Sequence, residues 1–286
     1  MNMKKIFLMN IVFFTMILGV SYIPVEGGSS EHLLQGFGVV ISFLTILWLV
    51  SIVLKDASII DIFWGPSFIV LGSSLIMIMD KVYSERALMI LFLVILWGMR
   101  LAIHLGIRNI GHGEDFRYVE WRKEGGSNYW WFSFFRVFSL QGALATLVGV
   151  SIYFGYLNEN PLSYIEVFFG STLFFIGIAW ESISDIQLKK FRKDPKNKGK
   201  ICKAGLWKYS RHPNYFGDLV VWTSIFTFSI SSNNILIILG SSLSPLIMGM
   251  IFYYITGPIL DQAMIKSRPE YKEYMKQSNS LFPKFK

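Results

Sequence analysis

The chain has 286 residues, of which 53% are hydrophobic and only 16% charged, and its net charge is +8. Soluble domains carry about 25% charged residues, so this composition excludes an ordinary soluble globular protein. The apolar residues fall in runs of about twenty, the length of a helix that crosses a hydrocarbon core of about 30 Å. We therefore expect an all-α fold, a polytopic transmembrane helical bundle.

The apolar segments are taken in chain order as candidate spans. The first follows Lys4 and Lys5 and could be a signal peptide, but no small-residue cleavage site is evident, so an uncleaved span is preferred. The last could be a hairpin that does not fully cross, so seven spans, eight or more are compatible with the sequence. The segments are residues 6–24, 33–54, 58–79, 87–107, 133–156, 163–182, 216–231 and 235–257.

Lys and Arg are distributed unevenly between the segments that connect these spans. With eight spans, one side receives almost all of them and the other only Lys81 and Arg86. Because basic loops face the cytoplasm, we expect a cytoplasmic N-terminus, C-terminus and loop 183–213. The basic side holds Lys4, Lys5, Lys55, residues 108–132, residues 183–213 and the tail 258–286.

Residues 183–213, here called the basic loop, contain ten Lys or Arg and two Asp. Their net charge of +8 equals the net charge of the whole chain. A dense cationic loop between apolar segments indicates an anion-binding site at a membrane surface. The single cysteine, Cys202, lies in this loop and cannot form an internal disulfide. The four histidines form no metal-ligand pattern, so no metal site is expected.

Glu181, Asp185 and Arg192 share one helical face at the entrance to the basic loop, because spacings of four and seven residues bring side chains onto one side of a helix. Carboxylates there can accept hydrogen bonds from ribose or amide groups, and Arg192 can bind phosphate. The alternative is a helix end with internal salt bridges, such as Asp185 with Lys189.

The stretch GLWKYSRHPNYFGD (residues 205–218) leads into the next apolar segment. Pro213 suits the first turn of a helix, whose free N–H groups favour an anion nearby. An interfacial belt would explain the aromatic and basic residues, but not Asn214 and Asp218, since polar groups at membrane depth are costly and usually functional. The belt residues are Trp207, Lys208, Tyr209, Arg211, His212 and Tyr215.

Two motifs, SDIQLKKF (residues 184–191) and GLWKYSRHPNYFGD, resemble membrane reductases with a steroid 5-alpha-reductase-like C-terminal domain, related to the sterol C14- and delta-reductases. The closing segment RPEYKEYMKQSNSLFPKF (residues 268–285) is similar too, so the resemblance covers about the last 100 residues. It implies an N-terminal half, residues 1–132, with a substrate cavity, and a C-terminal half, residues 133–286, that binds NADPH.

The resemblance also implies which residues hold the cofactor. No GxGxxG follows a strand in this chain, so a Rossmann site is not an alternative and the nucleotide must be held among helices. The implied cofactor-binding residues are Glu181, Asp185, Arg192, Lys200, Trp207, Tyr209, Arg211, His212, Asn214, Asp218 and Tyr271.

In the family, NADPH reduces a C=C bond conjugated to a carbonyl, and a Glu and a Tyr hold the carbonyl. By the weaker echoes WGPSF (residues 64–68) and WGMRL (residues 97–101), those positions are Trp64 and Trp97 here. We therefore expect Asp61, with His104 or Tyr118 as donor, to replace them, unless Asp61 is only a partner for Arg100. The expected enzyme is an oxidoreductase acting on CH–CH groups of a lipid-soluble sterol-like or isoprenoid compound.

Two other functions stay open. Isoprenylcysteine carboxyl methyltransferases share an RHPxY stretch, matched by residues 211–215, and bind S-adenosylmethionine, but their closing carboxylate pair is replaced by Asp261 and Gln262. A transporter or scaffold fits less well, because the polar residues gather at one membrane face. The expected partners are a small lipophilic substrate and the bilayer, with no nucleic acid and no obligate protein partner evident.

Overall fold

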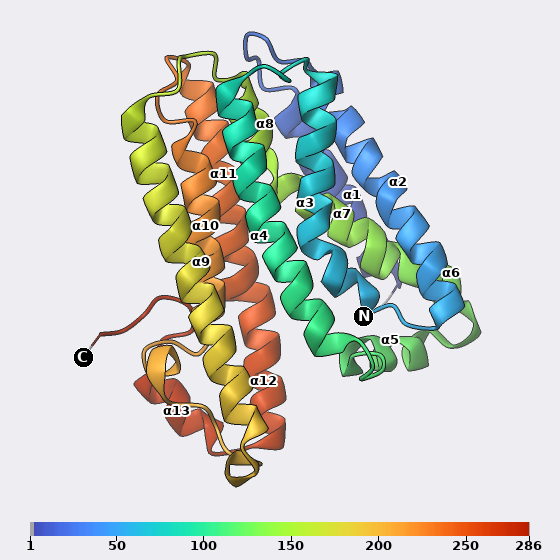
Figure 1. Cartoon of the computed structure of the whole chain (residues 1–286). Helices are drawn as coiled ribbons and strands as arrows, with labels where there is room; N and C mark the ends of the chain where they lie inside the picture. The colour runs from blue at the N-terminus through green and yellow to red at the C-terminus, as the bar shows by residue number, and fades with distance from the viewer. Residues whose placement is uncertain (1–2, 286) are drawn as a thin grey trace. The chain divides into compact units, whose positions relative to one another are not determined.

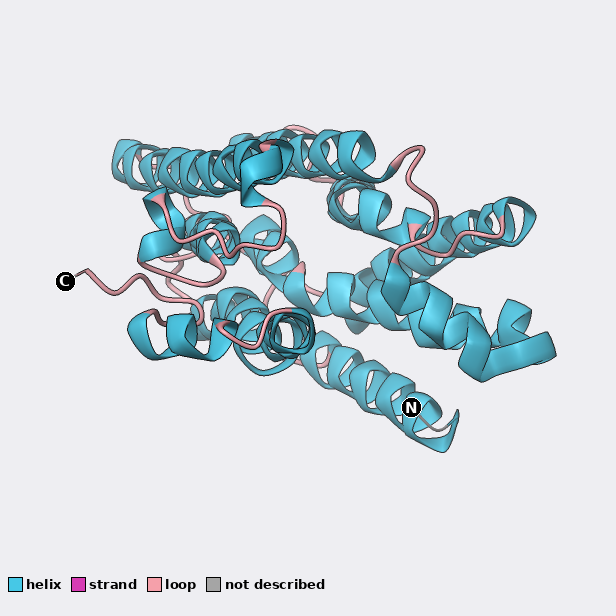
Figure 2. Ribbon diagram, turned by 90° about the horizontal axis from the view of Figure 1, so that it is seen from below, coloured by secondary structure: helices cyan, strands magenta, loops and turns pink. Residues whose placement is uncertain are grey.

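A computed structural model describes residues 3–285 of the chain, which are 78% helical and contain no strand. Figure 2 shows the helices joined only by loops and turns. The α-helices are α1 (Met3–Ser21), α2 (Ser30–Leu54), α3 (Ile59–Ile78), α4 (Glu85–Asn109), α5 (Phe116–Gly125), α6 (Tyr129–Ser133), α7 (Leu140–Val148), α8 (Val150–Leu157), α9 (Tyr164–Lys193), α10 (Pro213–Thr227), α11 (Ile235–Met250), α12 (Gly257–Ser267) and α13 (Tyr271–Gln277). Two π-helices, η2 (Phe134–Ser139) and η5 (Ile251–Thr256), and the short 3₁₀ helices η1 (Gly126–Asn128), η3 (Pro195–Asn197) and η4 (Gly205–Lys208) complete the set.

Within residues 3–285, seven helical stretches are long and apolar enough to cross a membrane: α1, α2, α3, α4, the run Phe116–Leu157, α9 and the run Ile235–Ser267. The prediction of an all-α polytopic bundle is confirmed. Helices satisfy all their backbone hydrogen bonds within one segment, which is what a bilayer without water demands.

The segment predicted at residues 216–231 forms α10, whose 15 residues make it shorter than the candidate spans. At 1.5 Å per residue α10 is about 22 Å long. Figure 1 shows α10 beside α9. Ser224 near the end of α10 donates a hydrogen bond to the Gly170 carbonyl near the start of α9, so the two helices run in opposite directions. α10 therefore returns the chain along α9.

The chain forms two compact units. Unit 1 is the described part of Met1–Leu162 together with Phe228–Leu243, and unit 2 is Ser163–Thr227 together with Ser244–Lys286 as far as residue 285. The boundary expected after residue 132 falls inside unit 1, because the helical run Phe116–Leu157 stays with the helices before it. All eleven expected cofactor residues lie in unit 2, and Asp61, His104 and Tyr118 lie in unit 1.

Within unit 1, α3 and α4 cross at two glycines. A Cβ added to Gly65 would lie 2.4 Å from the Gly98 carbonyl oxygen, so only glycine permits this approach. Beside the crossing, the Phe68 ring packs edge-on against both Trp64 and Trp97, with ring centroids 5.2 and 5.3 Å apart. Trp64 and Trp97 are thus part of an aromatic cluster at the crossing of α3 and α4.

Residues 228–243 return to unit 1 through polar contacts. Arg86, 2% exposed, donates to the carbonyl oxygens of Phe228 and Asn160, and Ser151 donates to the Ser241 carbonyl at 2.7 Å. Phe228 and Asn160 lie at chain turns, where helical partners end, whereas the Ser241 carbonyl lies inside α11, four residues before Pro245, which has no N–H to donate.

Candidate functional site

The end of α9 that leads into the basic loop presents a buried polar face. Glu181 is 3% exposed, Ser184 0% and Asp185 8%. The first turn of α9, at the opposite end of the helix, is stabilised by a capping box in which Ser163 and Glu166 exchange hydrogen bonds. Glu181 and Asp185 are four residues apart and therefore on one face, as predicted.

α10 brings two further predicted residues to this face. A Cβ on Gly217 would lie 2.5 Å from the Glu181 backbone nitrogen and 2.7 Å from the Gly177 carbonyl oxygen. The two backbones therefore touch, and Asp218, which is 6% exposed, lies at the level of Glu181. Asn214 is half-buried one turn earlier on α10. We call Glu181, Asp185, Asn214 and Asp218 the carboxylate seam.

η4 packs the aromatic part of the motif onto α9. The Trp207 indole N–H donates to the Ser184 carbonyl at 2.9 Å, and the Leu206 backbone N–H donates to Gln187 Oε1 at 2.9 Å. Trp207 is therefore bound to the residue that precedes Asp185, and its indole N–H is occupied by the backbone of α9.

Asp261 on α12 is the centre of a second buried network. One carboxylate oxygen accepts from Arg211 Nε at 3.0 Å, and the other accepts from His212 Nε2 at 3.0 Å and from the Tyr271 hydroxyl at 2.8 Å. Sequence reasoning did not assign Asp261 to the site. The available signal was its position four residues after the apolar segment 235–257, because a carboxylate so close to a membrane segment rarely lacks a partner.

The segment after α13, residues 278–285, is called the tail from here on, and it pairs with residues 209–212. Arg211 and His212 donate their backbone N–H groups to the Asn279 and Ser280 carbonyls at 2.9 and 3.1 Å, and Lys284 donates to the Tyr209 carbonyl at 2.9 Å. Burial raises the pKa of both Tyr271 and Tyr274, so each phenol keeps its proton. The Asp261 network therefore fixes the tail against the RHPNY motif.

The other cationic residues predicted to hold the cofactor lie at the surface. Arg192 and Lys200 are exposed, at the end of α9 and in the basic loop. The loop is tied down by Arg268, whose Nε donates to the Gly199 carbonyl at 2.8 Å. Cys202 is 8% exposed, and its burial raises the pKa of the thiol.

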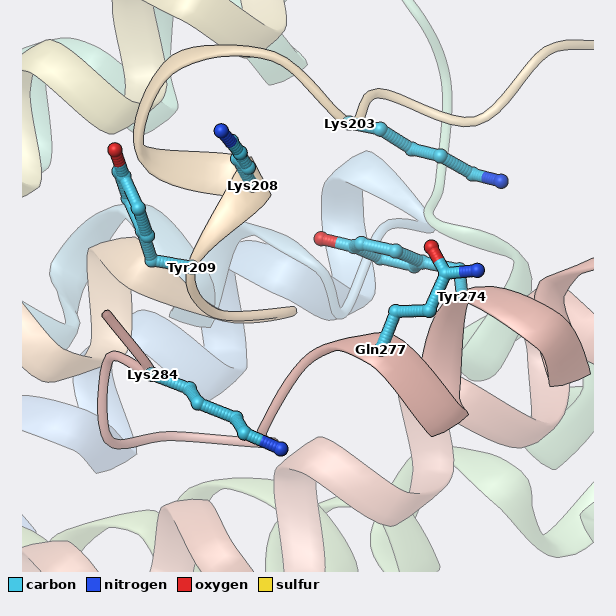
Figure 3. Close-up of a pocket in the computed structure, with 6 residues that line it drawn as sticks. All are labelled: Lys203, Lys208, Tyr209, Tyr274, Gln277 and Lys284. Carbon is cyan, nitrogen blue, oxygen red and sulfur yellow. The ribbon is translucent and has the colours of Figure 1, made fainter. Parts of the chain in front are cut away.

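One pocket in unit 2 is formed by the basic loop, α13 and the tail (Figure 3). It has a volume of about 150 Å³. Tyr209 is the one predicted cofactor residue in its lining, which consists of Lys203, Lys208, Tyr209, Tyr274, Gln277 and Lys284.

In unit 1, two of the three predicted catalytic residues meet. The Tyr118 hydroxyl donates to Asp61 Oδ1 at 2.6 Å, and Arg117 Nη2 donates to Asp61 Oδ2 at 2.6 Å. Arg117 also binds Asp115, which caps α5; burial opposes ionisation of Asp115, but the hydrogen bond and charge of Arg117 lower its pKa. His104 lies half-buried on α4 in the same unit.

Comparison with known proteins gives a family and distant relatives. A family described as "Protein of unknown function (DUF1295)" matches residues 47–278. The "Probable O-methyltransferase ustE" of Ustilaginoidea virens is 40% identical over 55 residues, 19% of each chain. The "Uncharacterized protein C594.04c" of Schizosaccharomyces pombe is 26% identical over 227 residues, which are 70% of this chain and 66% of the relative. No solved structure matches.

Proposed function

We propose, from the premise that this chain belongs to the DUF1295 family within the steroid 5-alpha-reductase-like group, that it is an NADPH-dependent integral-membrane reductase. Its substrate would be a lipid-soluble compound, sterol-like or isoprenoid, with a C=C bond conjugated to a carbonyl. The observation that carries the proposal is the carboxylate seam of unit 2, which lies where α9 enters the basic loop.

The residues of unit 2 fit a phosphorylated nucleotide. Glu181, Asp185 and Asp218 supply buried acceptors for the hydroxyl and amide donors that a dinucleotide carries. The exposed Arg192 and Lys200 supply the positive charge that phosphates require. When bound, NADPH would supply the hydride for the β-carbon of the substrate.

In this proposal Arg211, His212 and Tyr271 act through Asp261. Their hydrogen bonds to one carboxylate set the position of residues 209–212 and thus of the start of α10. A site built on a fixed helix start is pre-organised for its ligand, so binding costs less conformational entropy.

For catalysis we propose Tyr118 as the residue that holds the proton for the substrate. Asp61 would orient the Tyr118 hydroxyl, and Arg117 would hold the Asp61 carboxylate in place through its second oxygen. His104 remains the alternative donor. Trp64 and Trp97 would shape an apolar surface in place of the family's carbonyl-binding Glu and Tyr.

A methyltransferase that uses S-adenosylmethionine is the second candidate, favoured by the 55-residue match to a probable O-methyltransferase. The two cofactors differ in charge, because NADPH carries phosphates and S-adenosylmethionine carries a sulfonium cation. The net +8 of residues 183–213 favours the phosphorylated one.

The test is cofactor identification by mass spectrometry of protein purified in mild detergent, followed by thermal unfolding with each added cofactor. We expect stabilisation by NADPH, a smaller effect from NADH and little from S-adenosylmethionine, since a ligand stabilises the folded state in proportion to its occupancy. Stabilisation by S-adenosylmethionine alone would reject the reductase and support the methyltransferase.

A further inference from the structure

The pocket of unit 2 gathers three cations that are far apart in the sequence. Lys203 and Lys208 come from the basic loop and Lys284 from the tail, and all three lie outside the candidate spans. Figure 3 shows their side chains around the rings of Tyr209 and Tyr274. No acidic side chain is found among the described residues that line the pocket, so its positive charge is not neutralised from within.

The size of the pocket limits what it can hold. Its volume of about 150 Å³ suits a single phosphate group with its ester substituents. Pockets that enclose a drug-sized ligand have about 300–1,000 Å³, so a whole dinucleotide does not fit.

Residues 207–210 separate this pocket from the carboxylate seam. The Tyr274 hydroxyl, whose ring lines the pocket, donates to the Trp207 and Ser210 carbonyls. Trp207 extends the other way, with its indole N–H bonded to Ser184 on α9. A ligand in the pocket is therefore divided from Glu181 and Asp185 by a backbone segment and a buried indole.

The tail beside the pocket carries exposed aromatic side chains. Phe282 and Phe285 are 56% and 69% exposed. The Phe282 ring lies 6.2 Å from Phe216 in the first turn of α10, and the Phe285 ring lies 5.1 Å from Tyr209. The tail is thus fixed at the start of an apolar helix, where exposed rings next to lysines are typical of a membrane–water interface.

We propose that this pocket binds the headgroup phosphate of an anionic phospholipid, with Phe282 and Phe285 inserted at the interface beside it. Basic pockets next to membrane helices bind such headgroups, and each Lys near an anionic surface contributes about 1 kcal/mol, which is about a fivefold change in affinity. The lipid would hold the tail, and with it residues 209–212, against the membrane.

The test uses the full chain reconstituted in nanodiscs of equal parts phosphatidylglycerol and phosphatidylcholine. The protein is then extracted in mild detergent without cofactor, and the retained lipids are quantified by mass spectrometry. We expect the parent to retain phosphatidylglycerol preferentially, and the triple variant Lys203→Gln, Lys208→Gln, Lys284→Gln to lose this preference by about tenfold or more. The matched control, Lys193→Gln, Lys196→Gln, Lys198→Gln, removes the same charge at exposed positions of the same loop and should retain it.

Thermal unfolding of both triple variants verifies that they fold, and the single variant Lys284→Gln, a surface change, repeats the test with less perturbation. Equal retention of phosphatidylglycerol by the two triple variants would overturn the proposal. Release of the lipid by inorganic phosphate would assign the pocket to a free anion, and release by NADPH would assign it to the cofactor; both overturn the lipid assignment. Because lipid retention is measured without cofactor, failure of the reductase proposal leaves this test unaffected.

Discussion

The Tyr118 hydroxyl and the Arg117 guanidinium bind different oxygens of the Asp61 carboxylate, each at 2.6 Å. A carboxylate whose two oxygens both accept hydrogen bonds is well placed to orient its donors, and the hydroxyl proton in the bond between Tyr118 and Asp61 belongs to Tyr118. Within unit 1 this arrangement favours Tyr118 over Asp61 as the group that holds a transferable proton.

Replacing Tyr118 with Phe removes one hydrogen bond and leaves the ion pair of Asp61 and Arg117. We expect a loss of about 1–2 kcal/mol in stability for Tyr118→Phe, and a larger loss of about 2–4 kcal/mol for Asp61→Asn, because this change weakens two hydrogen bonds at once and leaves Arg117 with Asp115 as its remaining carboxylate partner. Thermal unfolding in detergent measures both, with Tyr83→Phe at a 94% exposed position as control. Equal losses for the two variants would contradict this account of the cluster.

The crossing of α3 and α4 makes a steric prediction. A Cβ on Gly65 meets the Gly98 backbone at 2.4 Å, which no side-chain movement can relieve, so Gly65→Ala should separate the helices and cost about 1–3 kcal/mol. Gly38 on α2 has nothing within 4 Å of an added Cβ, and Gly38→Ala should be neutral or stabilise by up to about 1 kcal/mol. If the two variants unfold at the same temperature, the close crossing is wrong.

The Asp261 network predicts that the tail depends on one carboxylate. Asp261→Asn leaves Arg211 and His212 buried without an anionic acceptor, which should cost about 3–5 kcal/mol. The tail should also become accessible to a protease in the folded protein, because residues 209–212 position it. The neighbouring change Gln262→Ala, at an exposed position, should alter neither property. An Asp261→Asn protein with a protected tail would show that the backbone pairing suffices.

The limits of sequence reasoning are clearest where residues meet across long separations. Apolar runs predicted the long helices, because a bilayer permits little else. The sequence did not reveal that Arg211 would be bound by Asp261, fifty residues later, since a basic motif looks the same whether it binds a ligand or a carboxylate. Nor did it reveal that Trp64 and Trp97 flank a glycine crossing, because helix contacts depend on tertiary packing.

Local spacing, by contrast, placed the carboxylate seam correctly on two helix faces. Glu181 and Asp185 share one face of α9, and Asn214 and Asp218 lie one turn apart on α10, as the four-residue spacing requires. The sequence could not say that Gly177 and Gly217 bring the two helices into backbone contact.

Cys202 makes a prediction for pH and topology. Its raised thiol pKa, caused first by burial, means less thiolate at pH 8 than an ordinary cysteine has, so alkylation should be slow and should accelerate only at higher pH.

Lys196→Cys in a Cys202→Ser background places a thiol at an exposed position of the basic loop. An impermeant maleimide should label it only from the cytoplasmic side, and labelling in intact cells would contradict the proposed orientation.

The cofactor assignment is tested at the carboxylate seam. Asn214→Ala or Asp218→Ala removes a hydrogen-bonding group of the seam proposed to hold NADPH and should cost about 1–3 kcal/mol each, which is about a five- to hundredfold loss of affinity. Arg192→Ala should weaken NADPH more than NADH if its guanidinium contacts the additional phosphate. Lys196→Ala, an exposed change in the same loop, should have little effect, because a solvated lysine on a flexible stem gains little from binding. Binding titrations in detergent compare the four variants, each with its unfolding temperature measured alone. If the seam variants bind NADPH like the parent while Lys196→Ala does not, the basic loop is a general electrostatic surface and the nucleotide is not held at the seam.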